Sequence, residues 1–375
     1  MKNISAYFVL LITWAIICLQ IPGLNIAFAP NEEPLKVGIA GLTHTHVHWI
    51  LGREDLGYIE IVGIAESNRE LAKKYMQQHG LPMSIVYESL DEMIHYAKPK
   101  AVLAFGSTFE HLEVVETCAP KGIHVMVEKP LAVNMDHAKK MAELAHENQI
   151  QLLTNYETTW YPTNHKTKEM IETGLIGDIR KVVIHDGHKG PKEIGVNEEF
   201  LEWLTDPVLN GGGAITDFGC YGTNLATWLA AGKKPISVTA LTQTFKPETY
   251  PDVDDEATIL LAYEDMQVII QASWNWPFSR KDMEVYGTKG YIFSDNRSDL
   301  KYKLSEIDGE KSMVLPELNP PVNDPFSYLA NVLNGSISME KFALSSLENN
   351  LIVVQLLDAA RKSAKNGETV YLTEQ

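Results

Sequence analysis

Two short groups of residues in this sequence carry side chains that could together move a proton. Lys129 stands just after the apolar run His124–Val127, and an ammonium group at the end of a strand can stabilise a developing alkoxide. Asp217 and Tyr221 are four residues apart, so on a helix that begins near Phe218 both would project from the first turn toward a common point. A cation beside a proton-transfer group suits a reaction in which a proton leaves an oxygen atom while negative charge develops on it.

Three alternating histidines, His44, His46 and His48, form a second candidate site. Imidazoles in such a pattern can gather Zn, Fe or Ni. A metal-dependent hydrolase would need further ligands from other strand ends, and no spacing singles out His111 or His124 for that role. We therefore predict no metal, and expect this loop to face a cofactor or substrate, with one or two of the histidines capping the next helix.

The elements that must position these residues alternate between short apolar runs and amphipathic stretches. Strands are expected at Leu35–Ala40, Ile59–Ala65, Ala101–Ala104, His124–Val127 and Gln151–Thr154, and helices at Arg69–His79, near Glu110–Ala119 and from about Asp136 to Asn148. This alternation predicts βαβ units and a parallel sheet. Ligands of such sheets bind beyond the carboxyl ends of the strands.

The end of the first predicted strand carries an incomplete dinucleotide-binding motif. Gly41 holds the first position of Gly-x-Gly-x-x-Gly, but Thr43 and His46 stand where the second and third glycines belong. Glu66 lies 25 residues after Gly41, near the spacing at which a carboxylate accepts hydrogen bonds from a ribose 2′-hydroxyl. Because a carboxylate there repels a 2′-phosphate, NAD is favoured over NADP. The alternative for Glu66 is a solvated residue at a strand end.

The second half of the sequence has a different pattern, in which strands follow one another directly and alternate apolar with polar residues. Hairpins are expected around Glu264-Asp265 and Thr288–Gly290, which predicts a mostly antiparallel open sheet with one covered face. Helices are expected at His165–Thr173, Gly219–Ala231, Pro325–Asn334 and Leu344–Lys365. The predicted fold class is therefore α/β plus α+β, with a Rossmann domain at 34–155 and a substrate and oligomerisation domain at 156–375.

Composition limits the classes of partner. The 375 residues carry 32 Lys and Arg against 49 Asp and Glu, a formal charge of −17. Such a chain lacks the basic face that nucleic-acid binding requires, so small molecules are the expected partners. Three cysteines are too few for a disulfide scaffold or a cysteine-built zinc site.

The amino-terminal residues have the pattern of a signal peptide for export. Lys2 precedes the apolar run Ile4–Leu19, and Ala27-Phe28-Ala29 is a small-x-small site that a signal peptidase could cut. Residues 1–29 are therefore expected to be a signal peptide, which would deliver the protein to the periplasm or the medium. The alternative is an uncleaved anchor, since about 20 apolar residues span a bilayer. After cleavage no contact with a membrane is expected.

Six segments occur in a characteristic order and, with their intervals, cover nearly all of the chain after residue 29. They are Glu128–Pro130, Gly174–Ile179, Trp203–Pro207, Gly211–Tyr221, Val285–Gly290 and Gly367–Val370. Together they resemble the glucose–fructose oxidoreductase / inositol dehydrogenase / MocA family. The resemblance implies a nucleotide-binding domain followed by an α+β domain, and the oxidation or reduction of a sugar or polyol hydroxyl with a nicotinamide cofactor. A homo-oligomer is expected from the same resemblance.

The resemblance also implies roles for single residues. Lys129 would polarise the reacting oxygen, Asp217 would orient the catalytic groups, and Tyr221 would move the proton at a position where most members have histidine and some branches have tyrosine. An adjacent Lys129 ammonium is expected to lower the pKa of the Tyr221 phenol from its reference value near 10. Pro130 is expected to fix the backbone through a cis bond.

The remaining predicted contacts divide between cofactor and substrate. Ser107, Thr108 and His111 are expected to line the cofactor. The full predicted NAD site is Gly41, Thr43, His44, His46, Glu66, Ser107, Thr108, His111, Glu128, Lys129 and Pro130. The predicted substrate contacts are Lys129, Trp160, His185, His188 and Tyr221, where Trp160 would stack on a sugar face. For the segment around His185 and His188, a solvated loop remains an open alternative.

The function predicted from the sequence is that of an exported NAD-dependent oxidoreductase acting on a hydroxyl of a sugar, polyol or glycoside. Free NAD is scarce outside the cytoplasm, so the cofactor is expected to stay tightly bound and to be recycled. A retained cofactor also permits an NAD-dependent glycosidase or lyase that works through a transient ketone. The remaining alternatives are the metal-dependent hydrolase with His44, His46 and His48, and a non-catalytic sugar-binding relative.

Overall fold

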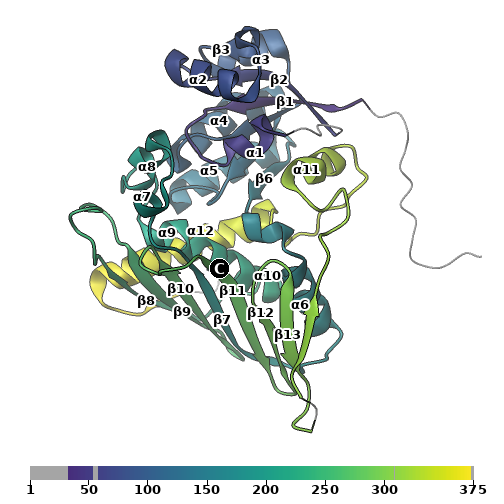
Figure 1. Cartoon of the computed structure of the whole chain (residues 1–375), viewed down its shortest axis with the longest axis vertical. Helices are drawn as coiled ribbons and strands as arrows, with labels where there is room; N and C mark the ends of the chain where they lie inside the picture. The colour runs from purple at the N-terminus through teal and green to yellow at the C-terminus, as the bar shows by residue number, and fades with distance from the viewer. Residues whose placement is uncertain (1–32, 54–57, 308, 373–375) are drawn as a thin grey trace, which may run out of the picture. The chain divides into compact units, whose positions relative to one another are not determined.

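The first half of the chain folds around a sheet of parallel strands in the order β3-β2-β1-β4-β5-β6 (Figure 1). The computed structural model describes residues 33–53, 58–307 and 309–372, and the predicted signal peptide lies outside these ranges. The strands are β1 (Leu35–Ala40), β2 (Ile59–Ala65), β3 (Val86–Tyr87), β4 (Ala101–Ala104), β5 (His124–Glu128) and β6 (Leu152–Asn155). This order reverses direction between β1 and β4, the place where doubly wound sheets bind ligands.

Short amphipathic helices cover this sheet. They are α1 (Val47–Leu51), α2 (Arg69–His79), α3 (Leu90–Ala97), α4 (His111–Cys118) and α5 (Met135–Glu147). Their ends follow from local chemistry: the Asn68 side chain accepts from Leu71 N–H to start α2, and Gly80 ends it in the left-handed conformation. The strands and helices predicted for this half are confirmed. Helix α1 was expected only as the helix that follows the histidine loop, without bounds, whereas β3 and α3 were not expected. The strand β3 has only two residues, too few to show a periodic pattern.

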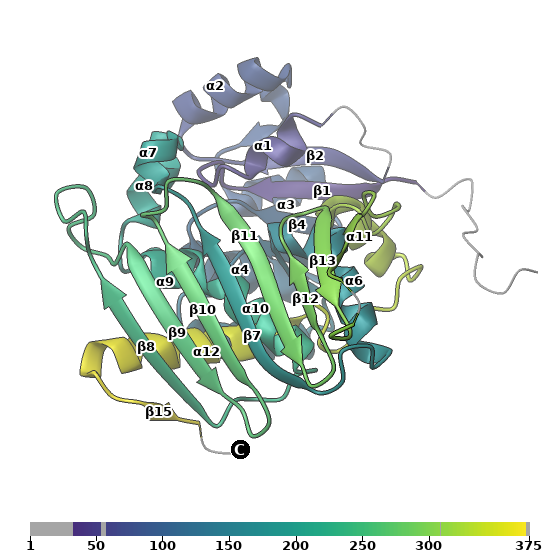
Figure 2. The same cartoon turned by 60° about the horizontal axis from the view of Figure 1, so that its bottom comes forward.

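The second half is built on a larger sheet with strand order β14-β13-β12-β11-β7-β10-β9-β8-β15 (Figure 2). Its strands are β7 (Ile179–Gly187), β8 (Ser237–Gln243), β9 (Glu256–Ala262), β10 (Gln267–Ser273), β11 (Arg280–Gly287), β12 (Tyr291–Ser294), β13 (Asp299–Lys303), β14 (Lys311–Val314) and β15 (Val370–Tyr371). The pairings between these strands are antiparallel except that of β7 with β10, which run parallel. The predicted mostly antiparallel sheet is confirmed.

Helices pack against one face of this sheet, and the opposite face carries no helix of the described residues (Figure 2). The helices of this half are α6 (Pro162–Glu172), α7 (Pro191–Ile194), α8 (Glu198–Leu204), α9 (Ala214–Asp217), α10 (Gly219–Leu229), α11 (Pro325–Leu333) and α12 (Leu347–Asn366). The covered face holds the apolar side chains of alternate strand residues, such as Val182 and Ile184 of β7. The fold therefore presents the first turn of α10 to the core of this sheet.

The long helix α12 contributes to the cores of both halves. Its residues Val353 and Leu357 belong to the apolar core under the large sheet, whereas Leu347 and Val354 pack into the core between the parallel sheet and α5. Because both faces are covered, the helix connects the two sheets through buried apolar surface. In the described part of the chain, no helix has the length and apolar character needed to cross a membrane.

A test of this packing is available at Gly222, where α10 lies closest to the sheet. An added Cβ would lie 2.3 Å from Ile270 Cγ2 of β10, and such overpacking costs about 1–3 kcal/mol. Alanine would gain about 1 kcal/mol in helix propensity, so the clash should win. We expect Gly222→Ala to lower the free energy of unfolding in urea by up to about 2 kcal/mol.

Gly219 in the same helix is the matched control. Its Cβ would meet nothing closer than Ile259 Cδ1 at 3.1 Å, so Gly219→Ala keeps the gain in helix propensity and should leave the free energy of unfolding unchanged or raise it by up to about 1 kcal/mol. Equal losses in the two variants would contradict this account of how α10 packs.

Candidate active site

A buried ion pair between Lys129 and Asp217 lies at the centre of the site. Lys129 follows the last residue of β5, Asp217 ends α9, and their side chains are only 6% and 7% exposed. The ammonium donates to Asp217 Oδ1, while the Trp274 indole N–H donates to Oδ2 at 2.9 Å. Burial alone would lower the pKa of Lys129, but the Asp217 carboxylate raises it above the usual value, so the group stays charged.

Asp254 fixes the start of the helix that carries Asp217. Its carboxylate accepts from Gly213 N–H at 3.0 Å and from Ile215 N–H at 2.7 Å, at the start of α9. Gly213 is required because a Cβ there would lie 1.8 Å from the Asp254 carbonyl oxygen. Burial raises the pKa of Asp254 to about 6 against the opposing effect of these backbone donors. The glycine-rich segment thus brings the chain close enough to Asp254 to aim Asp217 at Lys129.

Tyr221 lies beside this ion pair, but its phenol is not made more acidic, as the sequence had led us to expect. Burial raises the pKa of Tyr221 well above its usual value, and the negative charge of Glu157 raises it further. Lys129 cannot offset this, because its ammonium is held by Asp217 and lies 5.4 Å from the centroid of the Tyr221 ring. The prediction of a lowered pKa is therefore wrong for this structure, and Tyr221 is a neutral phenol.

Glu128 links this group to the histidine loop. His46 Nδ1 lies 2.9 Å from Glu128 Oε2, and the Asn155 amide donates to Oε1 at 2.8 Å. Burial would raise the pKa of Glu128, but the charge and hydrogen bond of His46 outweigh it and lower the pKa to about 2. The peptide bond between Lys129 and Pro130 is cis, as expected. Glu128 is thus a fixed anion at the last residue of β5, directly before Lys129 in the sequence.

The three histidines of the loop have separate partners. Although ligand atoms of His44, His46 and Glu128 lie within 4.8 Å of one another, His44 Nδ1 accepts from the His46 backbone N–H at 3.1 Å. Burial and the charge of His46 hold the pKa of His44 well below its usual value, so the neutral ring carries its proton on Nε2 and that nitrogen has no lone pair for a metal. His48 instead contacts His79 at 2.8 Å. His46 stands at the N-cap of α1 but makes no side-chain capping bond there.

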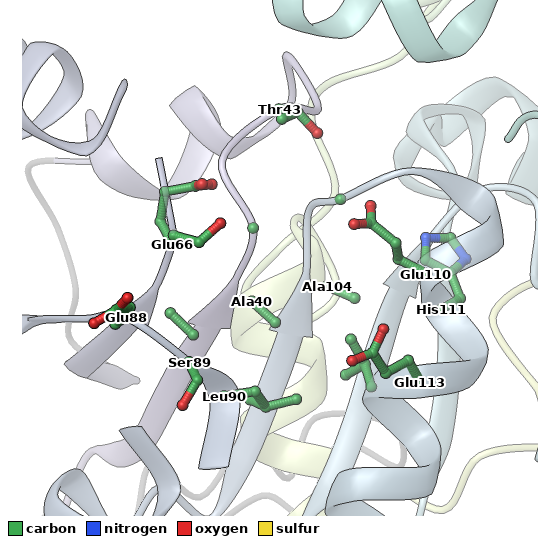
Figure 3. Close-up of a pocket in the computed structure, with 15 residues that line it drawn as sticks. Ala40, Thr43, Glu66, Glu88, Ser89, Leu90, Ala104, Glu110, His111 and Glu113 are labelled. Carbon is green, nitrogen blue, oxygen red and sulfur yellow. The ribbon is translucent and has the colours of Figure 1, made fainter. Parts of the chain in front are cut away.

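A cavity of about 460 Å³ opens at the reversal point between β1 and β4 (Figure 3). Of the predicted cofactor residues it is lined by Gly41, Thr43, Glu66 and His111, and carboxyl groups approach it from both sides in Figure 3. Glu66 accepts from Leu42 N–H at 3.0 Å and from Asn68 N–H at 2.8 Å. An acidic rim without a described Lys or Arg in the lining suits ribose hydroxyls and opposes a 2′-phosphate.

The residues around this cavity fit a dinucleotide. Thr43 Oγ1, His44 Nε2 and His111 Nε2 are buried without a hydrogen-bond partner, a state that costs about 1–3 kcal/mol each unless a polar ligand meets them. At Gly41, where φ is +78°, a Cβ would lie 2.9 Å from Gly106 N. Gly41 thus lets the chain approach Gly106 closely. Thr43, which stands in place of the second glycine, adds a hydroxyl group that can donate to a ligand.

Two other predicted cofactor residues already have partners. The Ser107 hydroxyl donates to Glu110 Oε2 at 2.7 Å, and the Thr108 hydroxyl donates to Asn210 Oδ1 at 3.4 Å. Both side chains are buried, and neither lines the cavity. The structure thus gives Ser107 the role of starting the next helical turn, and Thr108 that of a contact to the second half of the chain.

Residues near α8 cover the dinucleotide loop from the second half. The Asn197 amide donates to the Thr43 carbonyl at 3.3 Å and to the Tyr75 hydroxyl at 3.0 Å, and the Thr45 hydroxyl donates to Asn197 Oδ1. The His44 ring packs edge-on against Phe200 of α8, with centroids 4.7 Å apart. The loop that would hold the cofactor is therefore tied to the other domain.

Of the three other predicted substrate residues, only His188 joins the group around Lys129. Burial lowers its pKa to about 4, and its Nδ1 accepts from Gly190 N–H at 2.9 Å. His185 contacts Asp282 at 2.9 Å on the opposite face of the sheet from Ile184, because side chains alternate along β7. Trp160 packs against Tyr328 in a separate cavity of about 320 Å³ and donates to Asn155. The structure therefore does not bring His185 and Trp160 to the group around Lys129, and their predicted contacts with substrate stay predictions.

The structure adds residues that sequence reasoning missed. Lys281 of β11 lies 4.7 Å from the Tyr221 ring centroid and forms an ion pair with Glu157. Asp186 of β7 is the neighbour of Lys281 across the two strands. No motif marks these residues, since charged side chains at strand ends are common in sequence. Only the pairing of β7 with β11 brings them beneath Tyr221.

The Rossmann sheet, the cavity at its reversal point and the buried lysine beside it define a nicotinamide-dependent oxidoreductase. Residues 35–156 match the model of the oxidoreductase family with an NAD-binding Rossmann fold, and residues 164–293 match the Gfo/Idh/MocA C-terminal domain. The chain belongs to the Gfo/Idh/MocA family, which confirms the resemblance seen in the sequence.

Relatives of known activity act on hydroxyl groups. The chain is 25% identical to trans-1,2-dihydrobenzene-1,2-diol dehydrogenase of Xenopus tropicalis, over 80% of this chain and 88% of that enzyme. It is 24% identical to myo-inositol 2-dehydrogenase of Thermotoga maritima, over 91% and 99% of the two chains. The crystal structure of aldose–aldose oxidoreductase from Caulobacter crescentus has the same fold, with a TM-score of 0.77 at 20% identity over 91% of this chain and all of that one.

The buried contact between Glu128 and His46 gives a prediction for acid stability. The pKa of Glu128 falls from 4.5 to about 2 on folding. The stabilisation of the fold by the Glu128 carboxylate is therefore fully present above the pKa of the unfolded state, and it is lost as the pH falls through the pKa of the folded state. A shift of this size corresponds to an order of 3 kcal/mol. Wild-type protein should lose that much more free energy of unfolding between about pH 5 and pH 2 than Glu128→Gln does.

Urea unfolding at several pH values measures the difference, and Glu143→Gln, at an exposed position of α5, serves as control. Parallel pH profiles for wild type and Glu128→Gln would show that the contact with His46 does not stabilise the Glu128 carboxylate on folding.

Proposed function

We propose that this protein oxidises or reduces a hydroxyl-bearing carbon of a sugar, polyol or glycoside with a tightly held NAD. The buried Lys129–Asp217 pair next to Tyr221 is the observation that carries the proposal. The activities of the relatives that act on a diol and on inositol support the substrate class. When bound, the nicotinamide supplies the hydride acceptor or donor.

The side chains around that position divide the remaining work. Lys129 remains charged because of Asp217 and stabilises negative charge on the substrate oxygen. Tyr221 is a neutral phenol in this environment, so it donates a proton to a carbonyl oxygen in the direction of reduction and must first lose its own proton in the direction of oxidation. Asp217 is held by Trp274 and keeps Lys129 in position.

Retention of the cofactor is supported by the contacts around Asn197. Asn197 binds Thr43 and Thr45 and so limits the movement of the loop at Gly41–His46 that would hold the dinucleotide. A cofactor that stays bound must be reoxidised within the cycle, which permits oxidoreduction between two substrates. It also permits glycoside cleavage through a transient ketone, and release of free sugar without net NADH distinguishes that reaction.

We also propose that the protein is exported and acts in the periplasm or the medium. The apolar run Ile4–Leu19 after Lys2 and the cleavage site at Ala27–Ala29 support export. The uncovered face of the large sheet supports a homo-oligomer. Retention of NAD and export are consistent with one another, because a retained cofactor needs no external supply.

Mass spectrometry of the small molecules released by denaturing the purified protein tests the cofactor directly. We expect NAD or NADH in an amount equal to the protein, and its conversion to the other form when the native protein is first incubated with a sugar or inositol substrate. Protein that releases no dinucleotide would refute the proposed function.

Two variants separate binding from chemistry in the same experiment. Lys129→Met should retain NAD but convert it slower by roughly three orders of magnitude, because the cation that stabilises the substrate oxygen is gone. Asn197→Ala should convert NAD normally but lose it on dialysis, because the loop at Thr43 is no longer tied to the second half. Normal conversion by Lys129→Met would refute the assigned role of Lys129.

The raised pKa of Tyr221 predicts an unusual pH dependence. Since the phenol stays protonated across the neutral range, the rate of oxidation in a single turnover should rise about tenfold per pH unit between about pH 6 and pH 9, whereas the rate of reduction should stay level. Stopped-flow measurement of the bound nicotinamide gives both rates.

Tyr221→His and Tyr221→Phe are the comparison variants. An imidazole has a reference pKa near 6.5, so oxidation by Tyr221→His should level off above about pH 7, while Tyr221→Phe should lose the pH-dependent rise. A wild-type rate of oxidation that is already level at neutral pH would contradict the role of Tyr221.

A further inference from the structure

Asp186 has a carboxyl group that the fold buries and leaves without a partner. It is the last residue but one of β7, and it pairs across the sheet with Ala272 of β10 and Lys281 of β11. Its side chain is 1% exposed, and neither carboxyl oxygen has a hydrogen-bond partner. Among the described residues no other carboxyl group has both oxygens in this state. Each such oxygen costs about 1–3 kcal/mol if nothing meets it.

The acidic neighbours of Asp186 in the site are already satisfied. Asp217 is bound by Lys129 and Trp274, and Glu157 is bound by Lys281 and by the Tyr161 hydroxyl at 2.6 Å. Among the described residues, the two lysines whose charges act on Asp186 are therefore both paired with other carboxylates. Burial raises its pKa well above the usual value, although the charge of Lys281 acts in the opposite direction. In the neutral form it offers one O–H donor and one carbonyl acceptor.

The position of Asp186 places these two hydrogen-bonding groups beside Lys281 and close to the Lys129–Tyr221 group. Because side chains alternate along a strand, Asp186 shares the helix-covered face of the sheet with Ile184 of β7. Lys281, its cross-strand neighbour, lies 4.7 Å from the Tyr221 ring centroid, and Lys129 lies 5.4 Å from the same centroid. The charges of both lysines act on Asp186. A ligand that reacts beside Lys129 thus meets Asp186 on the side of the large sheet.

We propose that Asp186 binds the hydroxyl group next to the one that reacts, which makes the site selective for uncharged substrates with two neighbouring hydroxyls. A hydroxyl both donates and accepts hydrogen bonds, so it matches the unused donor and the unused acceptor of this carboxyl group. An anionic substrate does not fit, because Lys129 and Lys281 are each paired with a carboxylate. The inference rests on the proposed function, since it assumes that a hydroxyl reacts beside Lys129.

The first test measures binding and does not depend on turnover. Thermal unfolding of the NAD-bound protein is followed with a panel of hexoses and inositols, and then with the single-deoxy derivatives of the sugar that stabilises it most. We expect that loss of one hydroxyl weakens binding to wild type by about 10- to 100-fold, the effect of two neutral hydrogen bonds. Asp186→Leu should bind the parent sugar and that deoxy derivative equally, and Asp186→Asn should retain most of the difference.

The second test is the stability of the variants without sugar. Asp186→Leu replaces an unpaired buried carboxyl group by an apolar side chain of similar size, so it should unfold at the same temperature as wild type or higher. A clear loss of stability would show that Asp186 serves the fold, and would overturn the inference. So would equal weakening of the parent sugar and the deoxy derivative by Asp186→Leu, or a wild-type protein that binds no member of the panel.

Failure of the proposed function gives a different result. A wild-type protein that binds the sugar through Asp186 but never converts its NAD refutes the oxidoreductase activity and leaves the role of Asp186 intact. When turnover is present, kcat/KM for the parent sugar should fall about 10- to 100-fold in Asp186→Leu, whereas kcat/KM for the deoxy derivative should stay unchanged.

Discussion

The ion pair between Lys129 and Asp217 is the interaction on which the site depends, because it joins the two halves of the chain inside a region without solvent. Lys129 comes from the end of β5, Asp217 from the end of α9, and neither side chain is more than 7% exposed. Removing one partner of a buried pair costs about 3–5 kcal/mol, since the other charge is left unpaired. Each residue therefore requires the other to be in place, and Asp254 and Trp274 hold the Asp217 side.

The other buried charges near Tyr221 are also paired with neighbouring groups. Glu128 contacts His46, and in the described part of the chain the two lysines near Tyr221 are each paired with a carboxylate, Lys129 with Asp217 and Lys281 with Glu157. A tyrosine in such surroundings keeps its proton, which is the opposite of what proximity to a lysine suggests in a sequence. The neutral phenol and the unpaired Asp186 are consequences of one arrangement, in which every strong charge already has a partner and hydrogen-bonding groups are left for an uncharged ligand.

The two halves also depend on each other outside the ion pair. Helix α12 places apolar residues in both cores, and Asn197 near α8 ties the dinucleotide loop to the second half. Without these contacts Thr43 and His46, which stand in place of two glycines, would be unexplained defects of a common motif. With them, the loop gains a hydroxyl and an imidazole that contacts Glu128, and its mobility is limited by a neighbouring domain.

The sequence by itself determined the fold class, the family, most elements of both sheets and the short segment Glu128–Pro130, because apolar periodicity and local motifs depend on neighbouring residues only. It also indicated Lys129, Asp217 and Tyr221 as one group. It could not indicate the direction of the Tyr221 pKa shift, the separation of His185 from the site, or Asp186 and Lys281 within it. Those properties depend on which strands pair and on how far each charge is from water, and only the tertiary structure decided them, because burial and long-range pairing set the electrostatic environment of each side chain.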